Sequence, residues 1–152
     1  MSYVLLIIDM QTKFDAAHSD YTQSYCVKEI KKAIKLNAVV IFVEYNNSGA
    51  TVNLLTDVVK KARYDKAFTI VKYGDDGSQV IDKFLKKKRI PRTHYRVCGV
   101  NTDACVIETV YGLSDMYIKK PLIEVVKKAC NSQYCHQEGI DEMMDIKNVR
   151  IV

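Results

Sequence analysis

One cysteine of the chain stands where a thiol can act as a nucleophile. In the stretch RVCGVNTDACVIETVYGL, Thr102 is a good helix N-cap, which places Cys105 in the first turn of the helix that follows. Unpaired backbone N–H groups and the helix dipole favour an anion there, so we expect this position to lower the pKa of the thiol. Cys98 lies inside an apolar run and fits a buried structural cysteine better. The pattern favours chemistry at Cys105.

Two charged residues at the ends of other apolar runs could complete a catalytic group. Asp9 closes YVLLIID, and Lys72 stands at the end of AFTIVKY. A nucleophile, a carboxylate that accepts its proton and a cation that balances the charge are the parts that covalent catalysis needs. Plainer alternatives are a turn or helix-capping role for Asp9 and a surface lysine paired with Asp75 or Asp76.

The segments that must position these residues alternate between two hydrophobic patterns. Short runs rich in Val and Ile predict buried strands over 3–9, 38–45, 67–73, 94–100, 121–129 and 148–152. Apolar residues at three- and four-residue spacing predict helices over 25–35, 54–62, 78–88, 104–118 and 136–146. This alternation predicts a Rossmann-like three-layer αβα fold, with an open, mainly parallel sheet of about six strands and helices on both faces.

Ligands of such sheets bind at the carboxyl ends of the strands. The predicted strands place Asp9, Glu44, Lys72 and the stretch GVNTDAC at that edge. Candidate catalytic residues from distant parts of the chain are therefore expected to meet there.

The composition fits one domain over residues 1–152. The chain is 48% hydrophobic and 27% charged, which is ordinary for a globular protein. The net charge is +5, but the lysines are spread along helix faces, so we expect no specific nucleic-acid partner. No apolar run approaches the roughly 20 residues that span a bilayer, and no secretory signal is visible, so no membrane partner is expected.

The five cysteines have no paired spacing. This pattern favours reduced thiols and a cytoplasmic location over a disulfide framework. Cys130, Cys135 and His136 could in principle bind a metal, but their spacing matches no common zinc pattern.

Three motifs, VLLIIDMQ, IVKYGDDGS and CGVNTDACV, resemble in their order and strand context those of the isochorismatase-like cysteine hydrolases. This superfamily includes nicotinamidases and N-carbamoylsarcosine amidohydrolases, and the similarity runs from Tyr3 to the final strand. The resemblance implies that Asp9 is the general base, Lys72 its cationic partner and Cys105 the nucleophile.

The same resemblance implies the walls of a substrate pocket. It implies a cis peptide bond between Val100 and Asn101, and backbone N–H groups of Asn101 and Cys105 that bind the substrate oxygen. Gln11, Val100, Asn101 and Ala104 are the substrate-binding residues that it implies.

The activity implied is hydrolysis of an amide-type C–N bond in a small molecule, through a thioester at Cys105 and without a cofactor. Nicotinamidases carry metal-binding histidines after the second strand, whereas the equivalent stretch here, VEYNNSGATVN, has none, so no metal is expected. Vinyl-ether hydrolysis of isochorismate is disfavoured, because that reaction does not need the cysteine.

Two further interpretations stay open. Shortened loops and the altered motif KYGDDGS suit a member that kept the fold but binds a ligand, or serves assembly, without turnover. In the second interpretation, Cys105 is a redox-sensing thiol that forms a sulfenic acid or a disulfide with Cys98. The resemblance also implies a homo-oligomer, for which the segment VYGLSDMYI could supply aromatic interface area.

Overall fold

Six parallel strands form the centre of the molecule, in a computed structural model that describes residues 2–152. The strands are β1 (Val4–Ile8), β2 (Val39–Tyr45), β3 (Ala67–Lys72), β4 (His94–Val100), β5 (Leu122–Asn131) and β6 (Val149–Ile151). They form one sheet in the order β3-β2-β1-β4-β5-β6, and every neighbouring pair is parallel.

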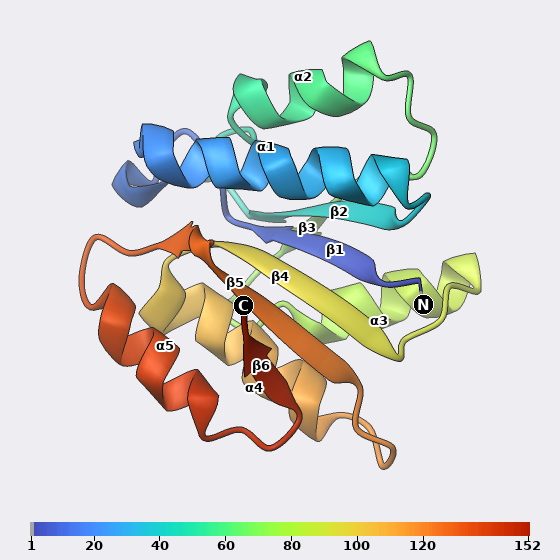
Figure 1. Cartoon of the computed structure of the whole chain (residues 1–152), viewed down its shortest axis with the longest axis vertical. Coiled ribbons are helices and arrows are strands. Elements are labelled where there is room, and N and C mark those ends of the chain that lie inside the picture. Colours follow the sequence, from blue (N-terminus) through green and yellow to red (C-terminus); the bar gives the residue numbers. More distant parts are fainter. Residues whose placement is uncertain (1) are drawn as a thin grey trace.

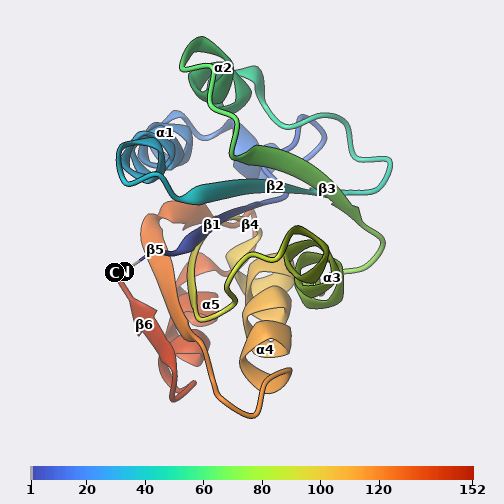
Figure 2. The ribbon, with the colours of Figure 1, turned by 90° about the vertical axis from the view of Figure 1, so that its right-hand side faces the viewer.

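Helices cover both faces of this sheet. They are α1 (Asp20–Lys35), α2 (Asn53–Lys61), α3 (Ser78–Lys88), α4 (Ile107–Asp115) and α5 (His136–Met144), with a 3-10 turn η1 (Asp15–His18) and a π-helical turn η2 (Thr102–Val106). Figures 1 and 2 show α1 and α2 on one face and α3, α4 and α5 on the other. The predicted three-layer αβα fold is confirmed. None of the helices in residues 2–152 is long and apolar enough to cross a membrane.

The central strand β1 is buried along its whole length because it is covered from both faces. Its residues alternate between the two layers: Leu5 and Ile7 pack in the core beneath α1 and α2, while Leu6 and Ile8 pack in the opposite core. A continuous apolar run is therefore the pattern that this position requires.

Two predicted helices differ from the structure at their starts. Helix α1 begins at Asp20, earlier than the predicted 25–35, because the hydroxyl of Ser19 accepts a hydrogen bond from the backbone N–H of Thr22 (3.2 Å). The helix predicted over 104–118 is divided into η2 and α4, and it ends at Asp115.

The strand order reverses between β1 and β4. The chain runs outward from β1 through β2 to β3 and then returns to the other side of β1 as β4. In open parallel sheets, ligands bind beyond the carboxyl ends of the strands at such a reversal. Asp9 directly follows β1 and η2 follows β4, so both predicted residues Asp9 and Cys105 lie at this point.

Gly99 allows β4 to approach β1 closely at the same edge. Its φ is +128°, and a Cβ atom built on it would lie 2.0 Å from the carbonyl oxygen of Ile8. Only glycine adopts this backbone conformation without strain and leaves room for Ile8.

Gly99→Ala should therefore lower the free energy of unfolding by at least about 2 kcal/mol, measured by urea denaturation. Gly74→Ala is the matched control, because a Cβ atom there meets nothing within 4 Å. We expect that control to change stability by less than about 0.5 kcal/mol. Equal urea midpoints for Gly99→Ala and the wild type would contradict the close approach of the two strands.

Candidate active site

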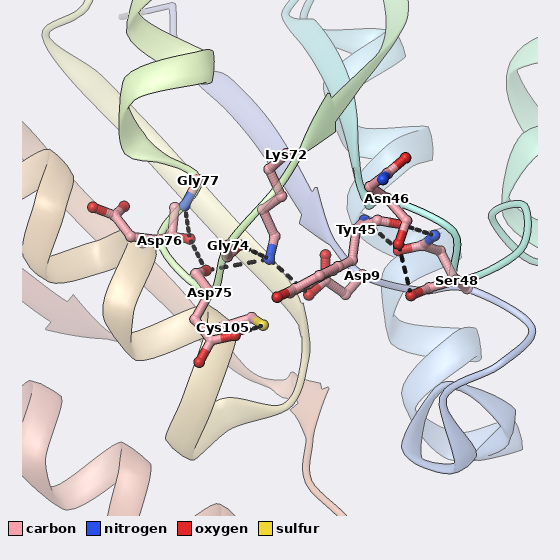
Figure 3. A network of polar contacts seen from close by, with 12 residues as sticks. Asp9, Tyr45, Asn46, Ser48, Lys72, Gly74, Asp75, Asp76, Gly77 and Cys105 are labelled. Atoms are coloured by element: carbon pink, nitrogen blue, oxygen red, sulfur yellow. Dashed lines mark hydrogen bonds and ion pairs between the residues drawn. The ribbon is translucent and has the colours of Figure 1, made fainter.

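A buried ion pair joins Asp9 to Lys72. The Nζ atom of Lys72 lies 3.1 Å from Oδ2 of Asp9, and both side chains are 1% exposed (Figure 3). Lys72 ends β3, which is separated from β1 by β2, so its side chain must extend past the β2 residue Tyr45. The Nζ atom lies 4.2 Å from the centroid of the Tyr45 ring.

Lys72 also holds the loop that follows its own strand. Its Nζ atom donates hydrogen bonds to the backbone carbonyls of Gly74 (2.8 Å) and Asp75 (3.2 Å). The alternative of a surface lysine paired with the carboxylate of Asp75 or Asp76 is wrong, because Lys72 is fully buried and its ion pair is with Asp9.

Asp9 combines an uncommon backbone conformation with a poorly solvated carboxylate. Its φ is +50°, in the left-handed region that few residues other than glycine adopt. Lys72 is its ion-pair partner at Oδ2, and within residues 2–152 no other group donates a hydrogen bond to either carboxylate oxygen. Burial raises the pKa of Asp9 and the charge of Lys72 opposes it, with burial the larger effect. A carboxylate with a raised pKa can both accept and return a proton.

Cys105 brings the third predicted group to the same place. Its side chain is 7% exposed, and its thiol donates a long hydrogen bond to Oδ1 of Asp75 (3.7 Å, Figure 3). Burial raises the pKa of the thiol, the negative charge of Asp9 raises it further, and Lys72 lowers it. The expected lowering by the helix start is wrong, because burial and Asp9 outweigh it. The thiol keeps its proton until a base accepts it.

The turn that carries Cys105 is a π-helical turn. The N–H of Val106 donates to the carbonyl oxygen of Asn101 (3.2 Å), and the residue at the helix N-cap is Asn101. Thr102 does not cap the helix as predicted, because its hydroxyl lies 2.7 Å from Nδ1 of His136. The peptide bond between Val100 and Asn101 is cis.

The polar side chains of this motif bind the segment 132–136 at the start of α5. The carboxamide oxygen of Asn101 accepts a hydrogen bond from the N–H of Gln133, and the carboxylate of Asp103 accepts from Ser132 and Cys135. Asn101, Thr102 and Asp103 therefore fix the shape of the turn.

The other predicted substrate-binding residues lie close by in the fold. The side-chain amide of Gln11 is buried and bonds to the backbone of Tyr45 and to the carbonyl of Gly49, so it anchors the segment after β2. Val100 is buried at the end of β4, and Ala104 is half-buried beside Cys105. Contact of these residues with a substrate stays a prediction.

The residues at this edge do not fit a metal ion. Residues 2–152 contain no group of three His, Cys, Asp or Glu side chains that could hold one. Glu44, the acid near the end of β2, uses Oε1 to accept hydrogen bonds from the N–H (2.9 Å) and the hydroxyl (2.8 Å) of Thr51.

Sequence reasoning missed how the loop 74–77 is held against Cys105. The hydroxyl of Thr109 in α4 accepts a hydrogen bond from the N–H of Gly77 (2.9 Å) and donates to the carbonyl of Asp75 (3.4 Å). Thr109 is far from this loop in the sequence, and its place in an apolar helical pattern gives no signal of the contact.

Several solved structures share this fold. The pyrazinamidase/nicotinamidase of Streptococcus mutans matches with a TM-score of 0.82 at 19% identity, over 99% of this chain and 100% of that chain. A MAR1 ribonuclease from Caenorhabditis elegans matches with a TM-score of 0.81 at 18% identity, over 99% and 77%. A protein of the isochorismatase family from Chromobacterium violaceum matches with a TM-score of 0.75 at 14% identity, over 99% and 89%. The chain thus has the isochorismatase-like fold that its motifs predicted.

A scan against protein-family models finds no match to the sequence, and a search of curated proteins finds none either.

The charges of Asp9 and Lys72 predict how substitutions of these residues change the rate at which Cys105 is alkylated. Asp9→Asn removes a negative charge that raises the pKa of Cys105, so alkylation by iodoacetamide at pH 7 should become roughly tenfold faster. Lys72→Met removes the opposing charge and should slow the reaction.

The rates are measured for each cysteine by peptide mass mapping, and the exposed Cys135 is the internal control whose rate should not change. A wild-type Cys105 that reacts as fast as Cys135, or a slower reaction in Asp9→Asn, would overturn this account of the thiol.

Proposed function

We propose that the chain is a cysteine hydrolase that cleaves an amide-type C–N bond of a small molecule through a thioester at Cys105. One observation carries the proposal: a thiol, a buried carboxylate and a buried ammonium group, from three distant parts of the sequence, converge at the point where the strand order reverses. The proteins of Streptococcus mutans and Staphylococcus aureus, which share the fold over 99% and 100% of this chain, carry the name nicotinamidase, which denotes hydrolysis of an amide.

The first half of the reaction forms the thioester. The carboxylate of Asp9 accepts the proton of the Cys105 thiol, and the sulfur attacks the carbonyl carbon of the amide. The oxygen of the tetrahedral intermediate accepts hydrogen bonds from the backbone N–H groups of Asn101 and Cys105. Asp9 then returns its proton to the nitrogen, the C–N bond breaks, and ammonia or an amine leaves.

The second half consumes water. Asp9, again ionised, accepts a proton from a water molecule that attacks the thioester carbon. The C–S bond breaks, the carboxylic acid leaves, and Asp9 returns the proton to the sulfur of Cys105. Lys72 keeps Asp9 in place and lowers the cost of its negative charge through both halves.

A second function is favoured by the closed state of the site. Cys105 is 7% exposed, burial and the negative charge of Asp9 raise the pKa of its thiol, and its hydrogen bond is to Asp75. These features suit a ligand-binding or assembly protein that kept the fold without turnover. Such a protein binds an amide without consuming it.

We also propose that the hydrolase acts on a small molecule, forms a homo-oligomer and works in a reducing compartment such as the cytoplasm. All five cysteines are free, and four of them are buried. Light scattering coupled to gel filtration measures the number of subunits.

Turnover is tested by ammonia release from nicotinamide, pyrazinamide and a panel of simple primary amides. We expect hydrolysis of at least one amide, a drop in kcat of at least about a thousandfold in Cys105→Ala, and an acyl adduct on Cys105 in intact-mass spectra. Cys135→Ser, at the exposed cysteine, should retain full activity. Turnover that survives Cys105→Ala would contradict the mechanism, whereas an amide that binds unchanged would support the second function.

The pH profile tests the role of Asp9. Asp9 must be ionised to accept the thiol proton, so kcat/KM should rise with pH through its pKa, which burial holds above the usual 3.8. Lys72 lowers that pKa, so Lys72→Met should move the rising limb to higher pH. Lys86→Met removes an exposed lysine that pairs with Asp82 and is the control. A shift of the limb to lower pH in Lys72→Met would contradict the assignment.

A further inference from the structure

The carboxylate of Asp75 stands beside the nucleophile and has no part in the reaction described above. We propose that Asp75 sets the charge preference of the site: it selects amides that carry a cationic group near the scissile bond and disfavours those that carry a carboxylate. This inference rests on the proposed function, in which Cys105 is the nucleophile that attacks the amide.

The position of Asp75 is built into the fold. Its backbone carbonyl accepts hydrogen bonds from Nζ of Lys72 (3.2 Å) and from the hydroxyl of Thr109 (3.4 Å), and the neighbouring Gly74 and Gly77 are bonded to the same two side chains. The loop is thus fixed from β3 and from α4. This leaves the carboxylate 3.7 Å from the sulfur of Cys105 (Figure 3).

The negative charge of Asp75 is the charge at the site that no neighbouring cation offsets. The negative charge of Asp9 is offset by Lys72 at 3.1 Å. Among residues 2–152, no Lys, Arg or His side chain forms an ion pair with the carboxylate of Asp75. With the thiol protonated, the three charged side chains sum to minus one, although the whole chain carries +5.

Exposure decides which carboxylate an entering molecule meets. Asp9 is 1% exposed, whereas Asp75 is exposed. A substrate that places its carbonyl carbon on the sulfur of Cys105 must therefore place neighbouring atoms near Asp75. One elementary charge at contact distance in water changes binding by roughly fivefold, and a lower local dielectric increases the effect.

Asp76 provides a matched comparison one residue along the chain. Its Oδ1 atom accepts a hydrogen bond from the N–H of Ser78 (2.7 Å), and Figure 3 shows its carboxylate directed away from Cys105. Asp76→Asn keeps an oxygen acceptor for Ser78 and removes the same charge as Asp75→Asn. The two variants differ in whether the lost charge faces the thiol.

The test uses two thiol reagents of opposite charge, the trimethylammonium and the sulfonate forms of ethyl methanethiosulfonate. Both transfer a thioalkyl group to sulfur and release methanesulfinate. Labelling rates at Cys105 are measured by peptide mass mapping at low salt. We expect the ratio of the cationic to the anionic rate to fall about fivefold or more in Asp75→Asn and to stay at the wild-type value in Asp76→Asn and Asp75→Glu.

Labelling needs no turnover, so the ratio of the two labelling rates tests the role of Asp75 independently of the proposed hydrolysis. An unchanged ratio in Asp75→Asn, or an equal fall in Asp76→Asn, overturns the inference. So does an equal loss of labelling by both reagents in Asp75→Asn with wild-type thermal unfolding, because a loss that does not depend on the charge of the reagent is not charge selection.

If an amide substrate is found, kcat/KM for cationic, neutral and anionic amides of similar size gives the second readout. We expect Asp75→Asn to lower kcat/KM for the cationic amide, raise it for the anionic one and leave the neutral one within about twofold. Turnover without any charge preference overturns the role of Asp75 and leaves the hydrolase proposal intact.

Discussion

The buried ion pair of Asp9 and Lys72 is the interaction on which the rest of the site depends. Two charges removed from water are tolerated only when the geometry is good and the remaining donors are satisfied. Lys72 meets this condition through Asp9, two backbone carbonyls of the loop 74–77 and the face of the Tyr45 ring. One ammonium group therefore contacts Asp9 after β1, Tyr45 in β2 and the loop after β3, and the same group lowers the pKa of Asp9.

The ionisation of the thiol follows from that pair. A cysteine at the start of a helix has a lowered pKa when it is exposed and beside a cation. Cys105 is at a helix start but is buried against the Asp9 carboxylate, and these two effects raise its pKa. The resting Cys105 is therefore a thiol, and the nucleophilic thiolate forms only as the proton moves to the carboxylate of Asp9. The protein thus keeps the proton within the pair of groups that needs it later for the leaving nitrogen.

The sequence predicted the sheet, Asp9 and Lys72 from apolar runs that end in a charge, and it predicted Cys105 from its place at the start of a helix. The run before Asp9 is β1, which is buried on both faces, whereas Lys72 ends β3, an edge strand in which Thr69 and Val71 are exposed and not buried as predicted. The early start of α1 was missed because its first turn is mostly polar and depends on Ser19. The place of Asp75 beside Cys105 could not be predicted, since it follows from Lys72 and Thr109, whose contacts are set by tertiary packing.

The loop 74–77 and the segment 132–136 lie near the thiol and are fixed in different ways. For this reason, residues that affect substrate preference differ from residues that affect the reaction itself. The segment 132–136 is bonded by the polar side chains of the motif that carries Cys105, and Ser132 and His136 are bonded through their own side chains, so changes at these two residues disturb the nucleophile itself. The loop 74–77 is held mainly through its backbone, by Lys72 and Thr109, which leaves the side chain of Asp75 free to vary without loss of the anchor. A position whose backbone is fixed and whose side chain is exposed beside the nucleophile can change substrate preference while Asp9, Lys72 and Cys105 stay in place.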